Sequence, residues 1–158
     1  MRVLVLSIGR VSGVGLIDAI SDYEERIGHY FGFESRELRA ERITGSVPER
    51  RVVERESQRL LEAVPPDLKT IAVDERGESW TSGDLARYLG DMALLSRPGA
   101  AFLVGGPLGH SPELRRKADR ILSLSSFTLP HELARLLLLE QIYRSGTILR
   151  GEPYHRGT

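Results

Sequence analysis

The sequence predicts an α/β fold with a mostly parallel sheet and helices on both faces of that sheet. Short apolar runs alternate with longer amphipathic stretches, so five strands and five helices are expected in turn along the chain. The first run, residues 3–8, has the apolar character of a central parallel strand. No repeat, low-complexity run or linker interrupts the pattern, and a length of 158 residues suits one domain over residues 1–158.

Two helices and a second strand are expected next along the chain, over residues 16–63. A helix over residues 16–29 follows the first strand, because apolar side chains recur there at the spacing of one buried helix face. Residues 33–38 alternate apolar and charged side chains, which is typical of a less buried strand. Ser46-Val47-Pro48-Glu49 reads as a capping box for a helix that runs to residue 63 and ends before Pro65-Pro66.

The rest of the chain continues the alternation, with strands expected at residues 70–73, 101–104 and 120–124 and helices at residues 81–95, 112 onward and 133–143. Asp74-Glu75-Arg76-Gly77 has the composition of a turn that closes the third strand. Ser111 and Pro112 supply an N-cap and a first helical position. The last helix has an apolar arc wide enough to predict burial on more than one side, and a polar tail covers residues 150–158.

The composition excludes several classes of protein. The 22 basic and 22 acidic residues give no net charge, so binding driven by bulk positive charge is not indicated. The absence of cysteine excludes disulfides, thiolate metal sites and a cysteine nucleophile. The apolar run at the N-terminus is too short for a signal peptide, and no stretch approaches the ~20 apolar residues that span a bilayer. We therefore expect a soluble, cytoplasmic protein without a membrane partner.

Two strand ends predict a ligand pocket. The apolar run 102–104 stops at Gly105-Gly106-Pro107-Leu108-Gly109, where the backbone can approach a ligand closely. The strand over residues 120–124 is followed by small hydroxyl residues and Pro130. Because the carboxyl ends of parallel strands meet at one edge of a sheet, a pocket is expected there. Alone, the glycine run is equally consistent with a structural turn, and Ser126 or Thr128 with a cap of the last helix.

A second glycine-rich loop, residues 9–15, offers an alternative function as an NAD or nucleotide site. Glu34 and Glu37 lie roughly 20 residues further on, where a ribose-binding acid is expected. The third glycine of the dinucleotide pattern would fall at Asp18, whose carboxylate would face the pyrophosphate. The loop is therefore more typical of an ordinary strand-to-helix connection.

The histidines give weaker signals. His131 is expected to cap or pack within the last helix, with a hydrogen-bonded ring, rather than to act in catalysis. His155 is the only tail residue whose side chain ordinarily titrates near neutral pH. No pair of histidines has metal-ligand spacing, so no metal is expected. A solvated basic face at a helix C-terminus is expected from Arg115, Arg116, Lys117 and Arg120.

Four sequence motifs follow one another along the chain. They are Leu103-Val104-Gly105-Gly106-Pro107-x-Gly109, Leu122-Ser123-Leu124-Ser125-x-x-Thr128-Leu129-Pro130-His131, Leu139-Glu140-Gln141-x-Tyr143-Arg144 and Gly151-Glu152-x-Tyr154-His155-Arg156. In this order and spacing they resemble the RlmH family, small bacterial enzymes of the SPOUT superfamily. The likeness covers essentially the full length, because the first strand, Tyr23-Glu24-x-Arg26 and Val73-Asp74-x-x-Gly77 also fit.

The resemblance implies an activity that periodicity alone does not reveal. RlmH enzymes use S-adenosylmethionine to methylate N3 of a pseudouridine in 23S ribosomal RNA, within the assembled ribosome. The family likeness also implies a homodimer and a C-terminal trefoil knot over about residues 101–145, in which the cofactor binds. A non-catalytic ribosome-binding module of the same fold stays open as an alternative.

The resemblance also implies roles for individual residues. Carried over position by position, the cofactor contacts are Val73, Gly105, Leu124, Ser125, Ser126, Phe127, Thr128 and Leu129. The tail would close over the cofactor of the partner subunit, with His155 assisting loss of the N3 proton, Arg156 holding a phosphate or base carbonyl, and Tyr154 positioning or stacking the base. Two departures from the family pattern, Leu108 in place of an acidic residue and the added Gly157-Thr158, lie outside the cofactor segment.

Overall fold

The computed structural model describes residues 1–155 and confirms the α/β class with a five-stranded sheet. The strands are β1 (Arg2–Ile8), β2 (Gly32–Leu38), β3 (Lys69–Ser79), β4 (Gly99–Val104) and β5 (Arg120–Ser123). They are ordered β2-β1-β4-β3-β5, and every neighbouring pair is parallel. Consequently the chain leaves all five strands at the same edge of the sheet, where the predicted pocket is expected.

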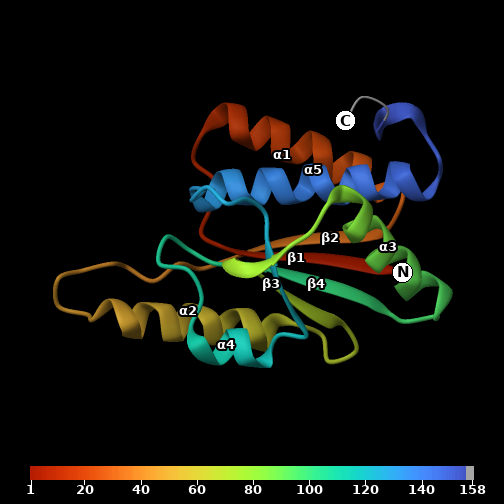
Figure 1. Ribbon diagram of the computed structural model, residues 1–158. Helices are drawn as coiled ribbons and strands as arrows, with labels where there is room; N and C mark the ends of the chain where they lie inside the picture. The colour runs from red at the N-terminus through yellow and green to blue at the C-terminus, as the bar shows by residue number, and fades with distance from the viewer. Residues whose placement is uncertain (156–158) are drawn as a thin grey trace.

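Helices cover both faces of the sheet, as predicted (Figure 1). They are α1 (Val14–Gly28), α2 (Glu49–Ala63), α3 (Ser82–Leu94), α4 (Pro112–Lys117) and α5 (His131–Leu149), followed by the short 3-10 helix η1 (Pro153–His155). Apolar side chains of α1, α3 and α5 pack with Val3, Val5 and Phe102 on one face, and those of α2 and α4 pack with Leu4 and Leu6 on the other. Successive strand residues therefore feed two separate cores.

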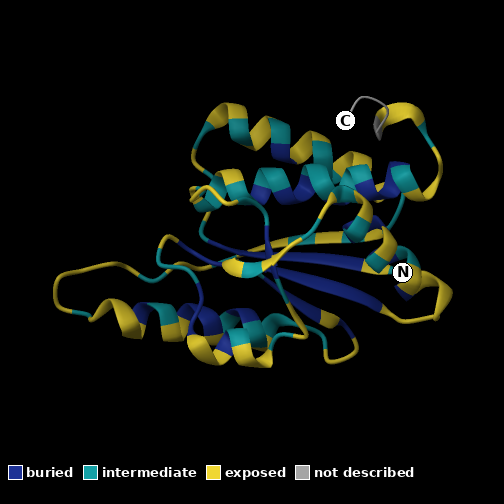
Figure 2. Ribbon diagram, viewed as in Figure 1, coloured by how far each residue is buried: buried dark blue, intermediate teal, exposed yellow. Residues whose placement is uncertain are grey.

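The centre of the sheet is the most deeply buried part of the molecule (Figure 2). All six residues of β4 are buried, and in β1 only Arg2 is exposed. The edge strand β2 alternates exposed and partly buried positions, which confirms its prediction as a less buried strand. This gradient explains why the apolar runs of β1 and β4 were the clearest strand signals in the sequence.

The predicted turn at residues 74–77 is wrong, because β3 continues through them to Ser79. Val73 and Glu78 both lie opposite Leu122 of β5, so the intervening residues form an outward bulge in the strand. Gly77 permits this close pairing, since a Cβ atom there would lie 2.6 Å from the Ile121 carbonyl. The turn-like composition thus marks a bulge and not the end of the strand.

The helix boundaries correct the predicted cap of α2 and decide against the alternative that a hydroxyl residue caps α5. Pro48, not Ser46, precedes α2 without a side-chain cap, and the Ser46 hydroxyl instead lies 2.9 Å from that of Thr44. Neither Ser126 nor Thr128 caps α5, which begins at His131 without a side-chain cap bond. Three other features agree with the predictions. α5 is buried on more than one side, α4 is capped by Ser111, and α3 begins at Ser82, where a helix over residues 81–95 was predicted. Thr81 and Asp84 form a capping box at this start.

Within residues 1–155, no helix has both the length and the apolar character needed to cross a membrane. The trefoil knot and the single domain over residues 1–158 stay predictions.

Candidate active site

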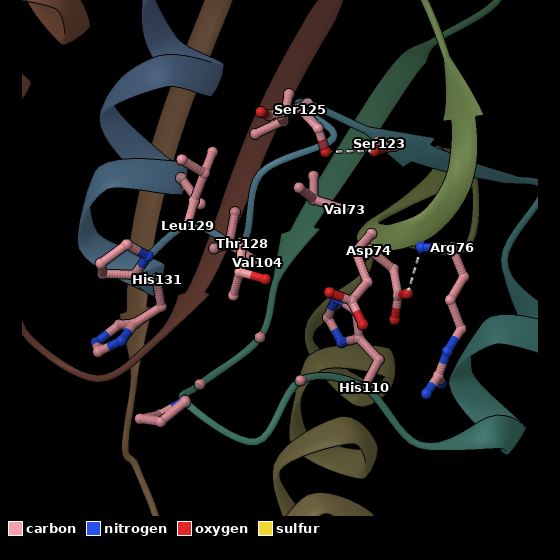
Figure 3. A pocket seen from close by; sticks show the side chains of 18 of the residues that line it. Val73, Asp74, Arg76, Val104, His110, Ser123, Ser125, Thr128, Leu129 and His131 are labelled. Atoms are coloured by element: carbon pink, nitrogen blue, oxygen red, sulfur yellow. Dashed lines mark hydrogen bonds between the residues drawn. The ribbon is translucent and has the colours of Figure 1, made fainter.

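A cavity of about 720 Å³ opens at the carboxyl ends of β3, β4 and β5. It lies where the two predicted ligand loops meet, and its walls include seven of the eight predicted cofactor contacts: Val73, Gly105, Leu124, Ser125, Phe127, Thr128 and Leu129. The eighth, Ser126, belongs to the same segment but is not part of the lining. Figure 3 shows Thr128, Leu129 and His131 on one side of the cavity and Asp74, Arg76 and His110 on the other.

One wall of the cavity is the glycine turn after β4. The Gly109 N–H donates to the Gly106 carbonyl over 3.0 Å, and Gly109 adopts a φ of +74°, which favours glycine. A Cβ atom on Gly105 would lie 3.1 Å from the Gly109 carbonyl carbon and oxygen. The turn is therefore closed tightly enough that this wall is made mainly of backbone.

The opposite wall is the segment between β5 and α5. The Ser123 hydroxyl donates to the Ser125 carbonyl over 3.1 Å, and the Ser125 hydroxyl accepts from the Phe127 N–H over 2.9 Å. These two hydroxyls shape the chain locally, while Leu124 and Leu129 supply apolar surface. The hydroxyl residues of this segment thus shape the wall and do not cap a helix.

A charged group closes the cavity beside the β3 bulge. The Arg115 guanidinium lies 3.3 Å from the Asp74 carboxylate and donates to the His110 carbonyl over 2.6 Å. Burial lowers the pKa of His110, whose Nε2 lies 3.1 Å from the Leu103 carbonyl, so the ring is neutral and donates through Nε2. The Arg115 side chain is only 18% exposed, so its prediction as part of a solvated face is wrong. The other three cations of that cluster are exposed, as predicted.

His131 also differs from its prediction. Its side chain makes no hydrogen bond within residues 1–155, although a capping or hydrogen-bonded ring was expected. Instead the half-buried ring lines the cavity at the first residue of α5. An imidazole is therefore available to a bound ligand at this point.

Comparisons with known proteins decide the family. A family model described as a predicted SPOUT methyltransferase matches residues 1–155. The chain belongs to the SPOUT methyltransferase family. Two relatives bear the name ribosomal RNA large subunit methyltransferase H. One, from Gemmatimonas aurantiaca, is 43% identical over 99% of this chain and 100% of its own length. The other, from Desulfitobacterium hafniense strain Y51, is 38% identical over 99% of each chain.

The fold of this SPOUT methyltransferase also has a relative among solved structures. The crystal structure of a TrmH/SpoU tRNA-modifying enzyme from A. aeolicus aligns with a TM-score of 0.53, covering 94% of this chain and 77% of that chain. The two sequences are 18% identical, so the likeness concerns the fold.

Two residues of α2 in this SPOUT methyltransferase, which the sequence did not predict, lie against the glycine turn and the start of α4. The Ser57 hydroxyl accepts from the Ser111 N–H over 2.9 Å, and the Glu56 carboxylate accepts from the Glu41 N–H over 2.9 Å. The second Glu56 oxygen is buried without a partner in the described chain and lies 2.8 Å from where a Cβ atom on Gly106 would sit. Burial raises the pKa of this carboxyl.

Arg135 fixes the start of α5 and was also missed. Its guanidinium donates to the carboxylates of Glu37 over 2.6 Å and Glu24 over 3.0 Å, and to the Ser35 hydroxyl over 3.2 Å. These bonds tie α5 to both α1 and β2, one turn after His131. A signal was present in the sequence, because Arg135 is the only charge within the apolar run 133–139.

The described part of the tail, residues 150–155, does not line the cavity of its own chain. The Tyr154 hydroxyl lies 3.4 Å from that of Tyr23 and donates to Glu140 over 3.3 Å, and its ring packs edge-on against Tyr143 at 4.7 Å. Glu140 is nine residues into α5, which places this contact about 14 Å along the helix axis from His131. The side chain of His155 and all of Arg156 lie outside the described part of the structure.

The alternative loop at residues 9–15 does not line the cavity. The Ser12 N–H and hydroxyl both donate to the Glu132 carboxylate, over 3.1 and 3.2 Å. A carboxylate of the chain itself thus takes the donors that a pyrophosphate would need. Within residues 1–155, no group of three or more His, Asp or Glu side chains is arranged to hold a metal ion.

Proposed function

We propose that this chain transfers a methyl group from S-adenosylmethionine to N3 of a pseudouridine in 23S ribosomal RNA, on the assembled ribosome in the cytoplasm. The observation that carries the proposal is the cavity at the carboxyl ends of β3, β4 and β5, between the glycine turn and the segment after β5, in a member of a methyltransferase family. The relatives named ribosomal RNA large subunit methyltransferase H favour ribosomal RNA as the substrate class.

The residues that line the cavity fit S-adenosylmethionine. A volume of about 720 Å³ is typical of a small-molecule site. Val73, Leu124 and Leu129 would enclose the adenine, and Gly105 would let the backbone approach the ligand. When bound, the cofactor would supply an electrophilic methyl group on a sulfonium sulfur, which becomes a neutral thioether as the methyl group leaves. The remaining predicted contacts would complete the site: Ser125, Ser126, Phe127 and Thr128.

A homodimer would bring the tail to this site. The described tail packs on the middle of its own α5 and does not line its own cavity. Apolar side chains at the N-terminal ends of α1 and α5 are exposed, namely Val14 (75%), Ile17 (46%) and Leu133 (43%). A self-complementary contact between two copies would cover them, and with antiparallel α5 helices it would place one tail beside the other cavity.

In this arrangement the protein contributes alignment and one proton transfer. Holding the base nitrogen, the methyl carbon and the sulfur in line supplies a large part of the rate. His155 of the tail would take the N3 proton, and Arg156 would hold a phosphate or polarise a base carbonyl. Tyr154 would position or stack the base, since its side chain remains 39% exposed beside its internal contacts.

Methyl transfer to ribosomes tests the proposal directly. Ribosomes from a strain that lacks this methylation are incubated with the protein and radiolabelled S-adenosylmethionine, and the modified nucleotide is located by mass spectrometry of 23S fragments. We expect one methyl group on a pseudouridine. Cofactor binding without transfer would favour the non-catalytic ribosome-binding module. Calorimetric binding of NAD or ATP, without binding of S-adenosylmethionine, would overturn the proposal in favour of a nucleotide enzyme.

A further inference from the structure

The turn that leads into the tail is held by four residues, here called the tail anchor: Tyr30, Gly146, Arg150 and Glu152. The Tyr30 hydroxyl donates to the Glu152 carboxylate. The Arg150 guanidinium lies 4.5 Å from the centre of the Tyr30 ring and donates to the His29 carbonyl over 2.6 Å. The anchor therefore clamps the chain beyond α5 to the loop that follows α1.

Gly146 provides the seat for the Tyr30 ring. A Cβ atom at this position would lie 2.5 Å from Cγ and 2.8 Å from Cβ of Tyr30, so only glycine lets the ring lie on the backbone of α5. The Tyr30 ring then meets Tyr143 edge-on at 5.7 Å, and Tyr143 meets Tyr154 at 4.7 Å. A row of three aromatic rings thus connects the anchor to the tail.

The Tyr30 hydroxyl is a permanent donor. Its hydrogen bond to Glu152, helped by burial, raises the pKa of Tyr30 to about 12, so the hydroxyl keeps its proton at neutral pH. Glu152 is fixed from its backbone as well, because its N–H donates to the Thr147 carbonyl over 2.9 Å. None of the four anchor residues lines the cavity.

We infer that Tyr30 and Glu152 are positioning residues, which hold the tail in the orientation from which it acts on the cavity of a second copy. The inference rests on the proposed function. A terminal segment without such contacts is ordinarily mobile. A displacement of about 1 Å in a reacting constellation can lower a rate on the order of 100-fold. Because the anchor does not line the cavity, it affects the rate of methyl transfer only by fixing the position and limiting the mobility of the tail.

The test uses Tyr30→Phe in the full-length protein, which removes one hydroxyl and keeps the ring on Gly146 and under Arg150. We expect single-turnover methylation of ribosomes to slow at least about tenfold at saturating cofactor. The dissociation constant for S-adenosylmethionine and the dimer mass should stay unchanged. Hydrogen exchange should rise in residues 150–155 and not elsewhere. Glu152→Leu should behave alike, whereas Glu152→Gln, which keeps an acceptor, should retain most of the rate.

Tyr88→Phe is the matched control. Tyr88 lies on α3 with its ring 5.1 Å from that of Trp80, and within residues 1–155 its hydroxyl makes no hydrogen bond. Tyr88→Phe should leave both the methylation rate and the hydrogen exchange of residues 150–155 unchanged.

Three results would overturn the inference. One is a wild-type rate in Tyr30→Phe. Another is a variant that loses cofactor affinity and the dimer together with the rate, which would indicate that Tyr30 has a general structural role. The third is unchanged hydrogen exchange of residues 150–155 in Tyr30→Phe. If wild-type protein fails to methylate ribosomes, the proposed function fails instead, and the exchange measurement still decides whether the anchor holds the tail.

Discussion

The two halves of α5 serve the molecule in different ways. The N-terminal half, with His131 and Arg135, stands beside the cavity, one wall of which is the glycine turn after β4. The C-terminal half, with Tyr143 and Gly146, carries a tail held by aromatic rings and charged groups. The difference indicates that cofactor recognition depends on the course of the chain, whereas the chemistry depends on a few particular side chains.

The largest effect is expected from loss of the proposed base, His155, which belongs to the tail and not to the cavity wall. We expect His155→Ala to lower turnover on ribosomes by about 10² to 10⁴-fold, because general base catalysis contributes that much. Cofactor affinity measured by calorimetry should stay at the wild-type value, since the cavity is built elsewhere. Full turnover in His155→Ala with bound cofactor would show that another group takes the proton.

Crowding the backbone wall should affect the cavity side instead. In Gly105→Val the new side chain would begin 3.1 Å from the Gly109 carbonyl and force the turn open. Overpacking of this kind typically costs about 1–3 kcal/mol, which is equivalent to roughly 5 to 150-fold in cofactor affinity. Gly15→Ala serves as control, because a Cβ atom there would meet nothing within 4 Å. Equal cofactor affinity in wild type and Gly105→Val would contradict a close approach at this glycine.

The buried carboxyl under the same wall should respond to pH. Burial raises the pKa of Glu56 above its usual 4.5, against the opposing hydrogen bond from the Glu41 N–H. The neutral form is therefore favoured by folding. Its stabilising contribution is complete below pH 4.5 and is lost as the pH rises through the folded-state pKa. Arg59, Glu41 and His131 also act on this carboxyl, and they remain in the variant described next.

We expect Glu56→Gln to gain stability relative to wild type as the pH rises above 4.5, and then to reach a plateau. Urea unfolding of both proteins across pH 4–8 measures the difference. The amide introduced by Glu56→Gln keeps a carbonyl oxygen that can accept from the Glu41 N–H, so the comparison isolates ionisation. Parallel stability profiles would mean that Glu56 does not change its charge state between the folded and unfolded chain.

Loss of the helix cap at the start of α3 should show the smallest effect, and it sets the scale for the others. Thr81→Ala removes the N-cap of α3 and should cost about 1 kcal/mol in urea unfolding. Ser46→Ala, at the cap that the sequence predicts and the structure lacks, should stay within about 0.5 kcal/mol. The reverse order of the two values would contradict the observed start of α2.

The order of strands and helices, and the edge of the sheet that carries the cavity, followed from the sequence. The apolar runs of β1 and β4 are continuous because both strands are covered on two faces, and Gly105 marks where one of them opens into a loop. The bulge in β3 was not predictable, because it depends on Gly77 lying against the backbone of β5, a strand that comes more than 40 residues later.

For the residues that support the site, too, the local position was predictable from the sequence and the long-range contacts were not. Glu56 has Val52 and Leu60 four residues to either side, so its buried position was available from helix spacing. Its contact with Gly106 was not, since that contact joins elements distant in the sequence. The partners of Arg135 on α1 and β2 were hidden for the same reason. Local sequence patterns therefore predict the helices and strands, whereas tertiary packing determines which side chains contact one another.

The unbroken course of α5 between Arg135 and Tyr143 sets a limit on insertions and deletions. Each residue added to a helix advances the chain by about 1.5 Å and turns it by about 100°. One extra residue between these two positions would turn Tyr143 and Gly146 to another side of the helix. Seven extra residues would restore their direction within about 20° but would shift them by roughly 10 Å along the axis. Changes of length are accordingly tolerable in the exposed loop before α2 and not in this stretch of helix.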